Sequence, residues 1–103
     1  MPILQEEENK GMKYIGYYEF DMKDFSKVIK KYQQRLAEPD KFPKIIFGPF
    51  GLNDGGKGFT GLETDDPEKL LRLQFHFVPE MDWKIVPISD ASMAIPLWKK
   101  MKE

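Results

Sequence analysis

The spacing of apolar and polar positions predicts a strand followed by a helix at the start of the chain. Residues 12–20, MKYIGYYEF, are rich in strand-forming aromatic residues and end at Asp21, which is suited to cap a helix. Apolar side chains then recur at helical spacing as far as Leu36, and the helix stops before Pro39. These apolar positions are Phe25, Val28, Ile29, Tyr32 and Leu36. The polar residues of the segment, Arg35 among them, are expected to fall mostly elsewhere on the helix.

The middle of the chain predicts a β-hairpin. Residues 44–50, KIIFGPF, and 57–65, KGFTGLETD, are extended in pattern, and the Asn-Asp-Gly-Gly sequence between them suits a tight turn. The segment 51–58, GLNDGGKG, is one residue short of the phosphate-binding pattern G-x-x-x-x-G-K-[ST], because Gly58 replaces the hydroxyl residue. A phosphate loop also leads into a helix, whereas the residues that follow here are extended. A hairpin turn is therefore favoured over a nucleotide site.

The rest of the chain predicts a second helix, a last strand and a terminal helix. The second helix begins at Asp66 with Pro67 in its first position and continues through PEKLLRLQFHFV. Residues 81–90, MDWKIVPISD, predict a strand in which Pro87 requires an edge or a bulge, since proline cannot donate to a ladder. The final stretch, ASMAIPLWKKMKE, predicts a helix that Pro96 kinks or divides.

The resulting order is β-α-β-β-α-β with a C-terminal helix. Right-handed crossovers close this order into one four-stranded antiparallel sheet with two helices on one face, a ferredoxin-like α+β sandwich. We assign residues 12–103 to this single domain and expect residues 1–11 to form a flexible tail.

Both faces of the predicted sheet are apolar. Side chains alternate between the faces of a strand. The two sets are Tyr14, Gly16, Tyr18 and Phe20 against Ile15 and Tyr17 in the first strand, Ile45 and Phe47 against Ile46 and Phe50 in the second, and Trp83, Ile85 and Pro87 against Val86 and Ile88 in the last. Two helices cover only one face, and the other would expose more apolar surface than soluble monomers usually do. We therefore expect a homodimer with its sheets packed face to face.

Composition narrows the classes of function. Sixteen basic and seventeen acidic residues give a formal net charge of -1, so no overall positive field gathers nucleic acid or an anionic membrane. The chain has no cysteine and one histidine, which excludes disulfides and argues against a zinc site. The N-terminus is acidic, and no segment approaches eighteen consecutive apolar residues. A cytoplasmic protein without a metal centre is expected.

An RNA-binding module is the alternative. Residues 57–59, KGF, begin like the third-strand signature of the RNA-recognition motif, which has the same element order. Thr60 and Gly61 then depart from the signature, and Gly61 stands where a base-stacking aromatic belongs. Tyr14 remains available to stack a base from the first strand. A purely structural dimer without a pocket is the other alternative.

The stretch GFTGLETDDPEKLLRL, followed by DWKIVPISD, resembles a group of small proteins of unknown function related to the dimeric α/β-barrel superfamily. The resemblance extends from Met12 to about Trp98, and its motif, the Asp-Asp-Pro-Glu helix start at 65–68 and the Val-Pro-Ile strand centre, is structural. It implies a homodimer with a pocket between sheet and helices for a small apolar or aromatic molecule. The superfamily includes cofactor-poor monooxygenases, haem-degrading enzymes and isomerases. The resemblance thus leaves open whether the chain is an enzyme and whether it takes haem.

Gln74 is the leading candidate for ligand binding. At about 100° per residue it falls near the centre of the apolar arc of the second helix, so its amide is expected to point inward. There it either bonds to backbone or orients a ligand, because a buried amide must find partners. Tyr14, Tyr18 and Trp83 are further candidates to line a pocket, although packing is the commoner role of such rings.

His76, Glu19 and Glu63 are the candidates for proton transfer. His76 is expected on the opposite side of the second helix as a solvated residue, and in the superfamily a helix-borne histidine can ligate haem or act as a base. Glu19 and Glu63 lie in strands, and either could exchange a proton if it faced the interior. In an enzyme, Gln74 would orient the substrate and a tyrosine would donate a proton. The sequence contains no recognisable nucleophile-base pair or metal cluster.

Overall fold

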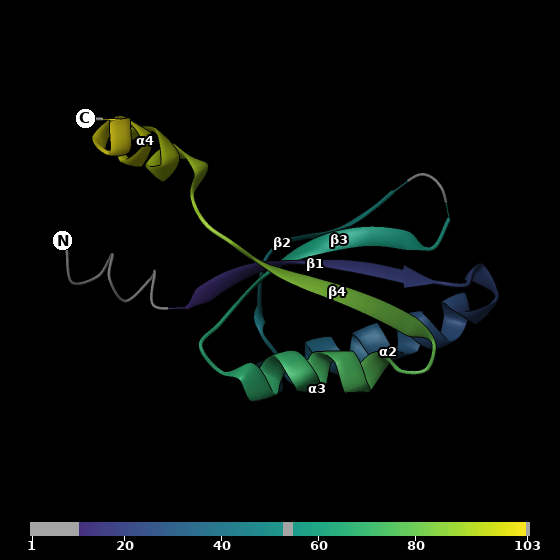
Figure 1. Ribbon diagram of the computed structural model, residues 1–103. Helices are drawn as coiled ribbons and strands as arrows, with labels where there is room; N and C mark the ends of the chain where they lie inside the picture. The colour runs from purple at the N-terminus through teal and green to yellow at the C-terminus, as the bar shows by residue number, and fades with distance from the viewer. Residues whose placement is uncertain (1–10, 53–54, 103) are drawn as a thin grey trace.

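A four-stranded sheet and two helices form two layers, with a third helix projecting from one end (Figure 1). The computed structural model describes residues 11–52 and 55–102, so the predicted tail lies outside the described residues except for Gly11. The elements are β1 (Met12–Phe20), α2 (Phe25–Ala37), β2 (Lys44–Gly51), β3 (Lys57–Thr64), α3 (Pro67–Phe77), β4 (Met81–Ile88) and α4 (Ala94–Lys102). Single 3₁₀ turns precede α2, β2 and α4.

The strand order is β2-β3-β1-β4, and all neighbouring strands are antiparallel. The predicted α+β element order is confirmed, and the open sheet with its helices is compatible with a ferredoxin-like fold. β4 is an edge strand, as Pro87 requires. The segment 51–58 joins β2 to β3 rather than a strand to a helix, so the hairpin prediction is confirmed. Asn53 and Asp54 of its tip lie outside the described residues.

Capping residues set the helix starts. The Asp66 carboxylate accepts a hydrogen bond of 2.9 Å from the Glu68 amide, with Pro67 at the first helical position as predicted. Asp21 instead caps the 3₁₀ turn Met22–Asp24, so α2 begins only at Phe25. The terminal stretch is divided after Met93 rather than at Pro96. Pro96 is the third residue of α4, where an amide has no partner within the helix, so proline is tolerated there.

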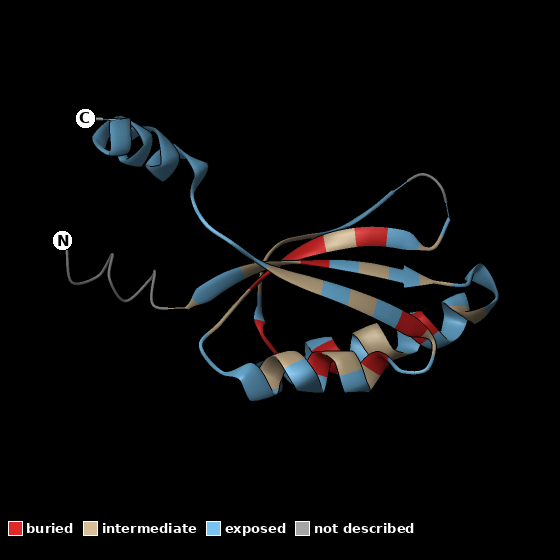
Figure 2. Ribbon diagram, in the orientation of Figure 1, coloured by how far each residue is buried: buried red, intermediate tan, exposed pale blue. Residues whose placement is uncertain are grey.

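The core lies between the sheet and the pair α2 and α3, where the buried residues gather in Figure 2. Its buried apolar members are Val28, Phe42, Leu62, Leu73, Phe77 and Met81. The register aligns Gly16 of β1 with Thr60 of β3 and Ile85 of β4, and paired residues share a face. Tyr14, Tyr18 and Phe20 therefore point toward the helices, as the alternation predicts.

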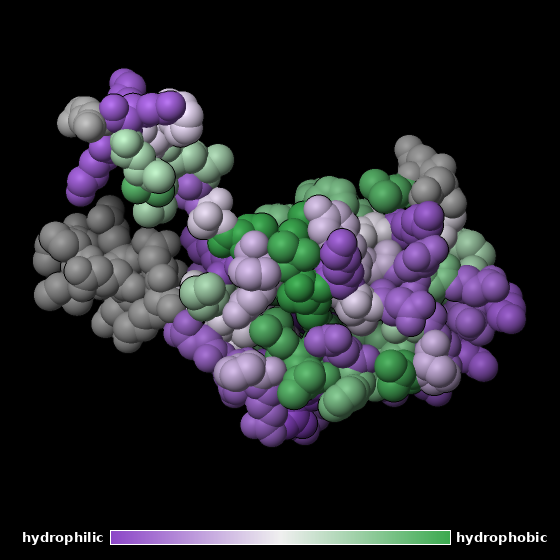
Figure 3. Space-filling view, in the orientation of Figure 1, coloured by the Kyte–Doolittle hydropathy of each residue, from purple (hydrophilic) through white to green (hydrophobic). Residues whose placement is uncertain are grey.

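The opposite face of the sheet, which we call the open face, is covered by neither α2 nor α3 (Figure 1). Its apolar residues include Ile15, Tyr17, Phe59 and Val86, and Tyr17 is 46% exposed. Every residue of α4 is exposed, and apolar side chains gather on one side of this helix (Figure 3). The chain thus has an apolar face that its own described residues leave uncovered.

The prediction that Ile45 and Phe47 share a face is wrong. The β2–β3 register shifts between Ile45 and Phe47 and again between Phe47 and Phe50. Ile45 pairs with the core residue Leu62, whereas Phe47 pairs with Gly61, and its ring occupies the space a Cβ would take there. A bulge inserts an extra residue and reverses the alternation, which a strict two-residue period cannot reveal.

Candidate functional site

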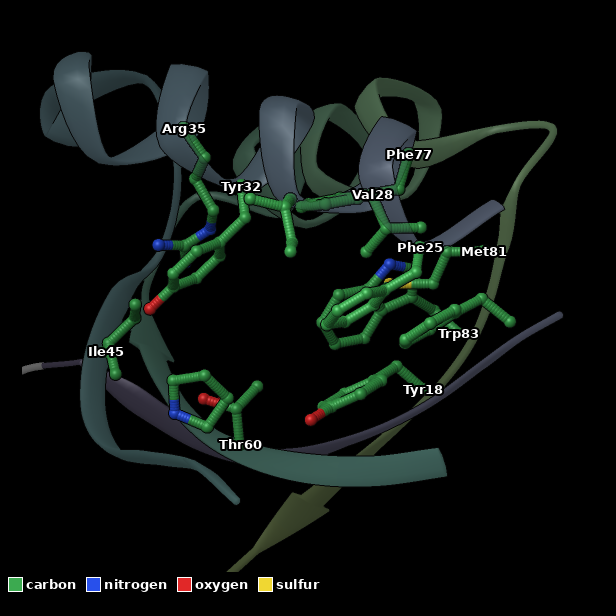
Figure 4. Close-up of a pocket in the computed structure, with 13 residues that line it drawn as sticks. Tyr18, Phe25, Val28, Tyr32, Arg35, Ile45, Thr60, Phe77, Met81 and Trp83 are labelled. Carbon is green, nitrogen blue, oxygen red and sulfur yellow. The ribbon is translucent and has the colours of Figure 1, made fainter. Parts of the chain in front are cut away.

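A cavity of about 180 Å³ lies between the sheet and α2 (Figure 4). Strands β1, β3 and β4 form its floor, α2 its roof, and the edge strand β2 one end. Its lining is Tyr18, Phe20, Phe25, Val28, Ile29, Tyr32, Arg35, Ile45, Pro49, Thr60, Phe77, Met81 and Trp83. Apart from Arg35 and Thr60, all of these residues are apolar or aromatic.

Aromatic rings brace one another at the apolar end of the cavity. The Tyr18 and Trp83 ring centroids are 5.6 Å apart, and those of Phe77 and Trp83 are 5.8 Å apart. Phe20 stacks on Phe25 at 6.0 Å, joining β1 to the first turn of α2. Such tilted and stacked pairs are favourable geometries for aromatic contacts. The rings therefore hold a fixed wall around the space.

Arg35 lies at the other end of the cavity, beside Tyr32 (Figure 4). It is only 5% exposed; its Nη2 donates to the Pro43 carbonyl at 2.9 Å, and its guanidinium lies 5.6 Å from the centre of the Phe42 ring. Burial lowers the pKa of Arg35, and Tyr32 acts in the opposite direction. An arginine nevertheless stays protonated in proteins. Among the described residues no carboxylate forms an ion pair with it.

Three hydroxyl groups complete the polar part of the wall. Thr60 Oγ1 donates to the Phe47 carbonyl at 3.0 Å, and the Tyr18 hydroxyl donates to the Phe50 carbonyl at 3.3 Å. Burial raises the pKa of Tyr18, and Tyr32 reinforces this shift. The Tyr32 hydroxyl makes no hydrogen bond within the described part of the chain, so it is available to a ligand.

Trp83 contributes a second unused donor. Its Nε1 is buried and has no hydrogen-bond partner among the residues that the structure describes. Buried donors are almost always paired in native proteins.

The structure separates the predicted ligand-binding residues. Tyr18 and Trp83 line the cavity, whereas Tyr14 packs against the core outside it. Gln74 is half-buried and lines no cavity; its Nε2 donates to the Leu70 carbonyl one turn earlier in α3, at 3.3 Å. Of the two interpretations of Gln74, bonding to backbone is the one observed. Tyr14, facing the core, is also not placed to stack a base.

None of the three candidates for proton transfer lies in the cavity wall. The prediction that His76 is a solvated surface residue is wrong: its Nε2 lies 2.7 Å from the Lys31 carbonyl of α2, and its ring lies between those of Phe42 and Phe77. Because a carbonyl only accepts, this Nε2 carries a proton and joins the two helices. Glu19 is exposed on the open face, 3.8 Å from Lys57. Glu63 is half-buried on the same face.

A second hollow of about 540 Å³ lies at the end of the molecule near Gly11. It is more polar than the cavity, and Lys44, Glu63 and Lys69 contribute to its wall. Arg35 borders both spaces. The arginine therefore lies in the wall between the two spaces.

Sequence reasoning missed Arg35, Tyr32 and Thr60 as site residues. Arg35 follows Val28 by seven residues, and positions seven apart lie on the same face of a helix. The available signal was therefore a charged residue within the apolar stripe of α2. In the sequence Thr60 is a departure from the RNA-binding signature, whereas in the structure it projects from β3 toward the helices.

Neither a metal-binding cluster nor a membrane-spanning helix occurs in the described part of the chain. Residues 11–52 and 55–102 contain no group of three or more histidine or carboxylate side chains arranged to hold a metal ion. Over the same ranges, no helix has the length and apolar character needed to cross a membrane.

Comparison with known proteins identifies the family. No curated protein and no solved structure is significantly similar to this chain. One family model matches residues 12–102, from the first residue of β1 to the last of α4. The chain therefore belongs to the family described as a domain of unknown function, DUF3303.

Proposed function

We propose that the protein binds a small, largely apolar organic molecule in the cavity between the sheet and α2. The observation that carries the proposal is the aromatic-lined space of about 180 Å³ with a few polar groups in its wall. Ligand sites are typically apolar concavities with few, well-placed polar groups. An apolar cavity of about 150 Å³ is large enough to hold benzene. One substituted six-membered ring therefore suits this space.

The cavity supports binding more strongly than catalysis. Its ionisable side chains are Arg35, Tyr18 and Tyr32, while the candidate bases His76, Glu19 and Glu63 lie elsewhere. Cofactor-poor oxidation or isomerisation would therefore rely on Tyr18 or Tyr32 as proton donor. We do not extend the proposal to haem, because a macrocycle is much larger than this cavity and His76 Nε2 is engaged by a carbonyl.

Tryptophan fluorescence tests the proposal. The chain has two tryptophans, Trp83 in the cavity wall and Trp98 in α4, so Trp98→Phe leaves Trp83 as the only reporter. Titration with toluene should change its emission in a saturable manner. Val28→Phe, which fills the cavity, should abolish the response, and Val78→Phe, the same change at an exposed site, should preserve it. No response in the reporter protein, or an unchanged response after filling, would contradict binding in the cavity.

We further propose that a second copy of the chain covers the open face, giving the homodimer typical of the dimeric α/β-barrel superfamily that the sequence resembles. Support comes from the exposed apolar centre around Tyr17 and from the charges around it. Both signs occur at each end, so the ends of two such faces can meet without building up like charge. The charged residues are Glu19, Lys57 and Asp82 at one end and Lys13, Lys44 and Glu63 at the other, and Lys84, which pairs with Tyr17, lies near the centre.

Sedimentation equilibrium tests the assembly. One chain has a mass of 12.1 kDa, and the proposed dimer has about twice that mass, since closed two-fold pairs are the commonest assemblies. Tyr17→Lys places a second positive charge beside Lys84 at the centre of the face and should yield monomers, whereas Lys30→Glu on the exposed side of α2 should not. A monomeric parent protein at micromolar concentration would contradict the proposal. Tight, salt-sensitive binding of single-stranded RNA by that monomer would favour the RNA-binding alternative instead.

A further inference from the structure

Building on the proposed function of the cavity, we propose that its ligand is a small organic anion, with an apolar ring-sized body and one carboxylate that pairs with Arg35. The proposal concerns the charge of the ligand, which an apolar cavity alone does not specify. It rests on the chemistry of the one ionised side chain in the cavity wall.

Arg35 is a buried cation without a counter-ion. It is 95% enclosed, given its 5% exposure, and no described carboxylate lies within ion-pair distance of it. Removing a charge from water is unfavourable unless an opposite charge or several hydrogen bonds replace the lost hydration. Among the residues that the structure describes, the Pro43 carbonyl and the Phe42 ring are the groups that serve that purpose. An anion entering the cavity would therefore pair with a guanidinium whose lost hydration is otherwise poorly replaced.

The lining carries a positive charge and no negative one. The thirteen lining residues include Arg35 but no aspartate, glutamate, lysine or histidine. A carboxylate within this wall would thus meet attraction from the guanidinium and no opposing carboxylate. A cationic ligand would meet the reverse, so the cavity selects by sign of charge as well as by shape.

The remaining donors match a carboxylate. A guanidinium has five N–H donors in one plane, and the hydrogen bond from Arg35 to the Pro43 carbonyl uses one of them. A carboxylate can accept two parallel hydrogen bonds from such a group. Tyr32, next to Arg35 in Figure 4, offers a further hydroxyl without a partner in the described chain. The aromatic end formed around Trp83 and Phe77 then receives the apolar body of the same molecule.

Benzoate and its neutral isostere benzamide separate the effect of charge from that of shape. Both are titrated into the Trp98→Phe protein with Trp83 fluorescence as the signal. We expect benzoate to bind at least about 10-fold more tightly than benzamide at low ionic strength, because a charge-assisted pair with Arg35 is available only to the anion. Equal or weaker binding of benzoate would overturn the inference, whereas toluene binding would still support the cavity as a site. Failure of all three probes would instead count against the proposed function itself.

Two arginine variants locate the interaction. Arg35→Met should remove the preference for benzoate while keeping toluene binding, since methionine retains an unbranched apolar side chain. Arg72→Met, at an exposed arginine that pairs with Glu68 on α3, should leave the preference unchanged. A preference that survives Arg35→Met would overturn the assignment to this residue. Because Arg35→Met could fail to fold, the side-chain Nε–Hε resonance of Arg35 in the parent protein gives a second measurement. Benzoate should shift this resonance and benzamide should not. No shift at saturating benzoate would equally overturn the inference.

Discussion

Two leucines of α3 provide a direct test of how this helix packs. Leu73 is 0% exposed and belongs to the core with Leu62 and Phe77, whereas Leu71, two positions earlier, is 51% exposed. Leu73→Ala removes a buried side chain and leaves a cavity, a change that costs about 2.7 to 5 kcal/mol of unfolding free energy. Leu71→Ala makes the same chemical change in the same helix, so helix propensity contributes equally to both. We expect it to cost less than about 1 kcal/mol.

Urea unfolding followed by far-ultraviolet circular dichroism measures the difference. A slope of about 2 kcal/mol per molar urea is typical of small domains, so a loss of about 3 kcal/mol lowers the midpoint by roughly 1.5 M. The two variants should be compared at the same protein concentration, because association would make the midpoint depend on it. Equal midpoints for Leu71→Ala and Leu73→Ala, or a larger loss for Leu71→Ala, would refute the packing of α3 described above.

Three further predictions concern the contacts that join the elements. His76→Leu should lower the unfolding free energy by about 1 kcal/mol in the same assay, because it removes the hydrogen bond to the Lys31 carbonyl, and no loss would contradict that contact. The ion pair with Lys31 lowers the pKa of Glu80, so its stabilisation is present above the ordinary glutamate pKa of about 4.3 and is lost as pH falls through the lower folded value. Glu80→Gln should therefore destabilise at neutral pH and progressively less as the pH falls below the ordinary glutamate pKa, and a constant difference across this range would exclude the linkage. Deletion of residues 91–103 removes no buried side chain among those described, so the thermal midpoint of the remaining domain should stay within a few degrees by calorimetry.

The element order was predictable because its signals are local. The proline and aspartate at the start of α3 and the glycine-rich turn before β3 act within a few residues, and local backbone chemistry fixes them. The orientation of α3 was predicted less well. Its outer surface also carries apolar residues, Leu71 at 51% and Phe75 at 67% exposure, and these widened the apolar arc until Gln74 fell near its centre. Periodicity weighs every apolar residue equally, whereas packing buried only one side of that arc.

Arg35 shows a different limit of the same reasoning. A charged residue is assigned to the surface by default, because burial of an unpaired charge is rare. Here Arg35 lies on the same face of α2 as the buried Val28, so its side chain is buried. It extends along the Phe42 ring to reach the Pro43 carbonyl. Both partners lie in the segment after α2, and their position relative to the helix depends on the chain reversal at residues 38–43 rather than on any local pattern. The polar end of the cavity is therefore a tertiary feature, while its aromatic end could be anticipated from β1 and β4.

The cavity itself depends on the irregularity of β2. With strict alternation Phe47 would point toward α2 beside Ile45, and its ring would occupy space next to Thr60. The two register shifts instead pair Phe47 with Gly61 and Phe50 with Phe59 on the open face, so that Ile45 and Pro49 are the residues of β2 that line the cavity. Glycine at 61 is what admits the Phe47 ring, because a Cβ there would lie 2.3 Å from a ring carbon. The shift between Ile45 and Phe47 thus opens the space beside Arg35 and adds the Phe47 ring to the face proposed for dimerisation, so both proposals depend on the same bulged strand.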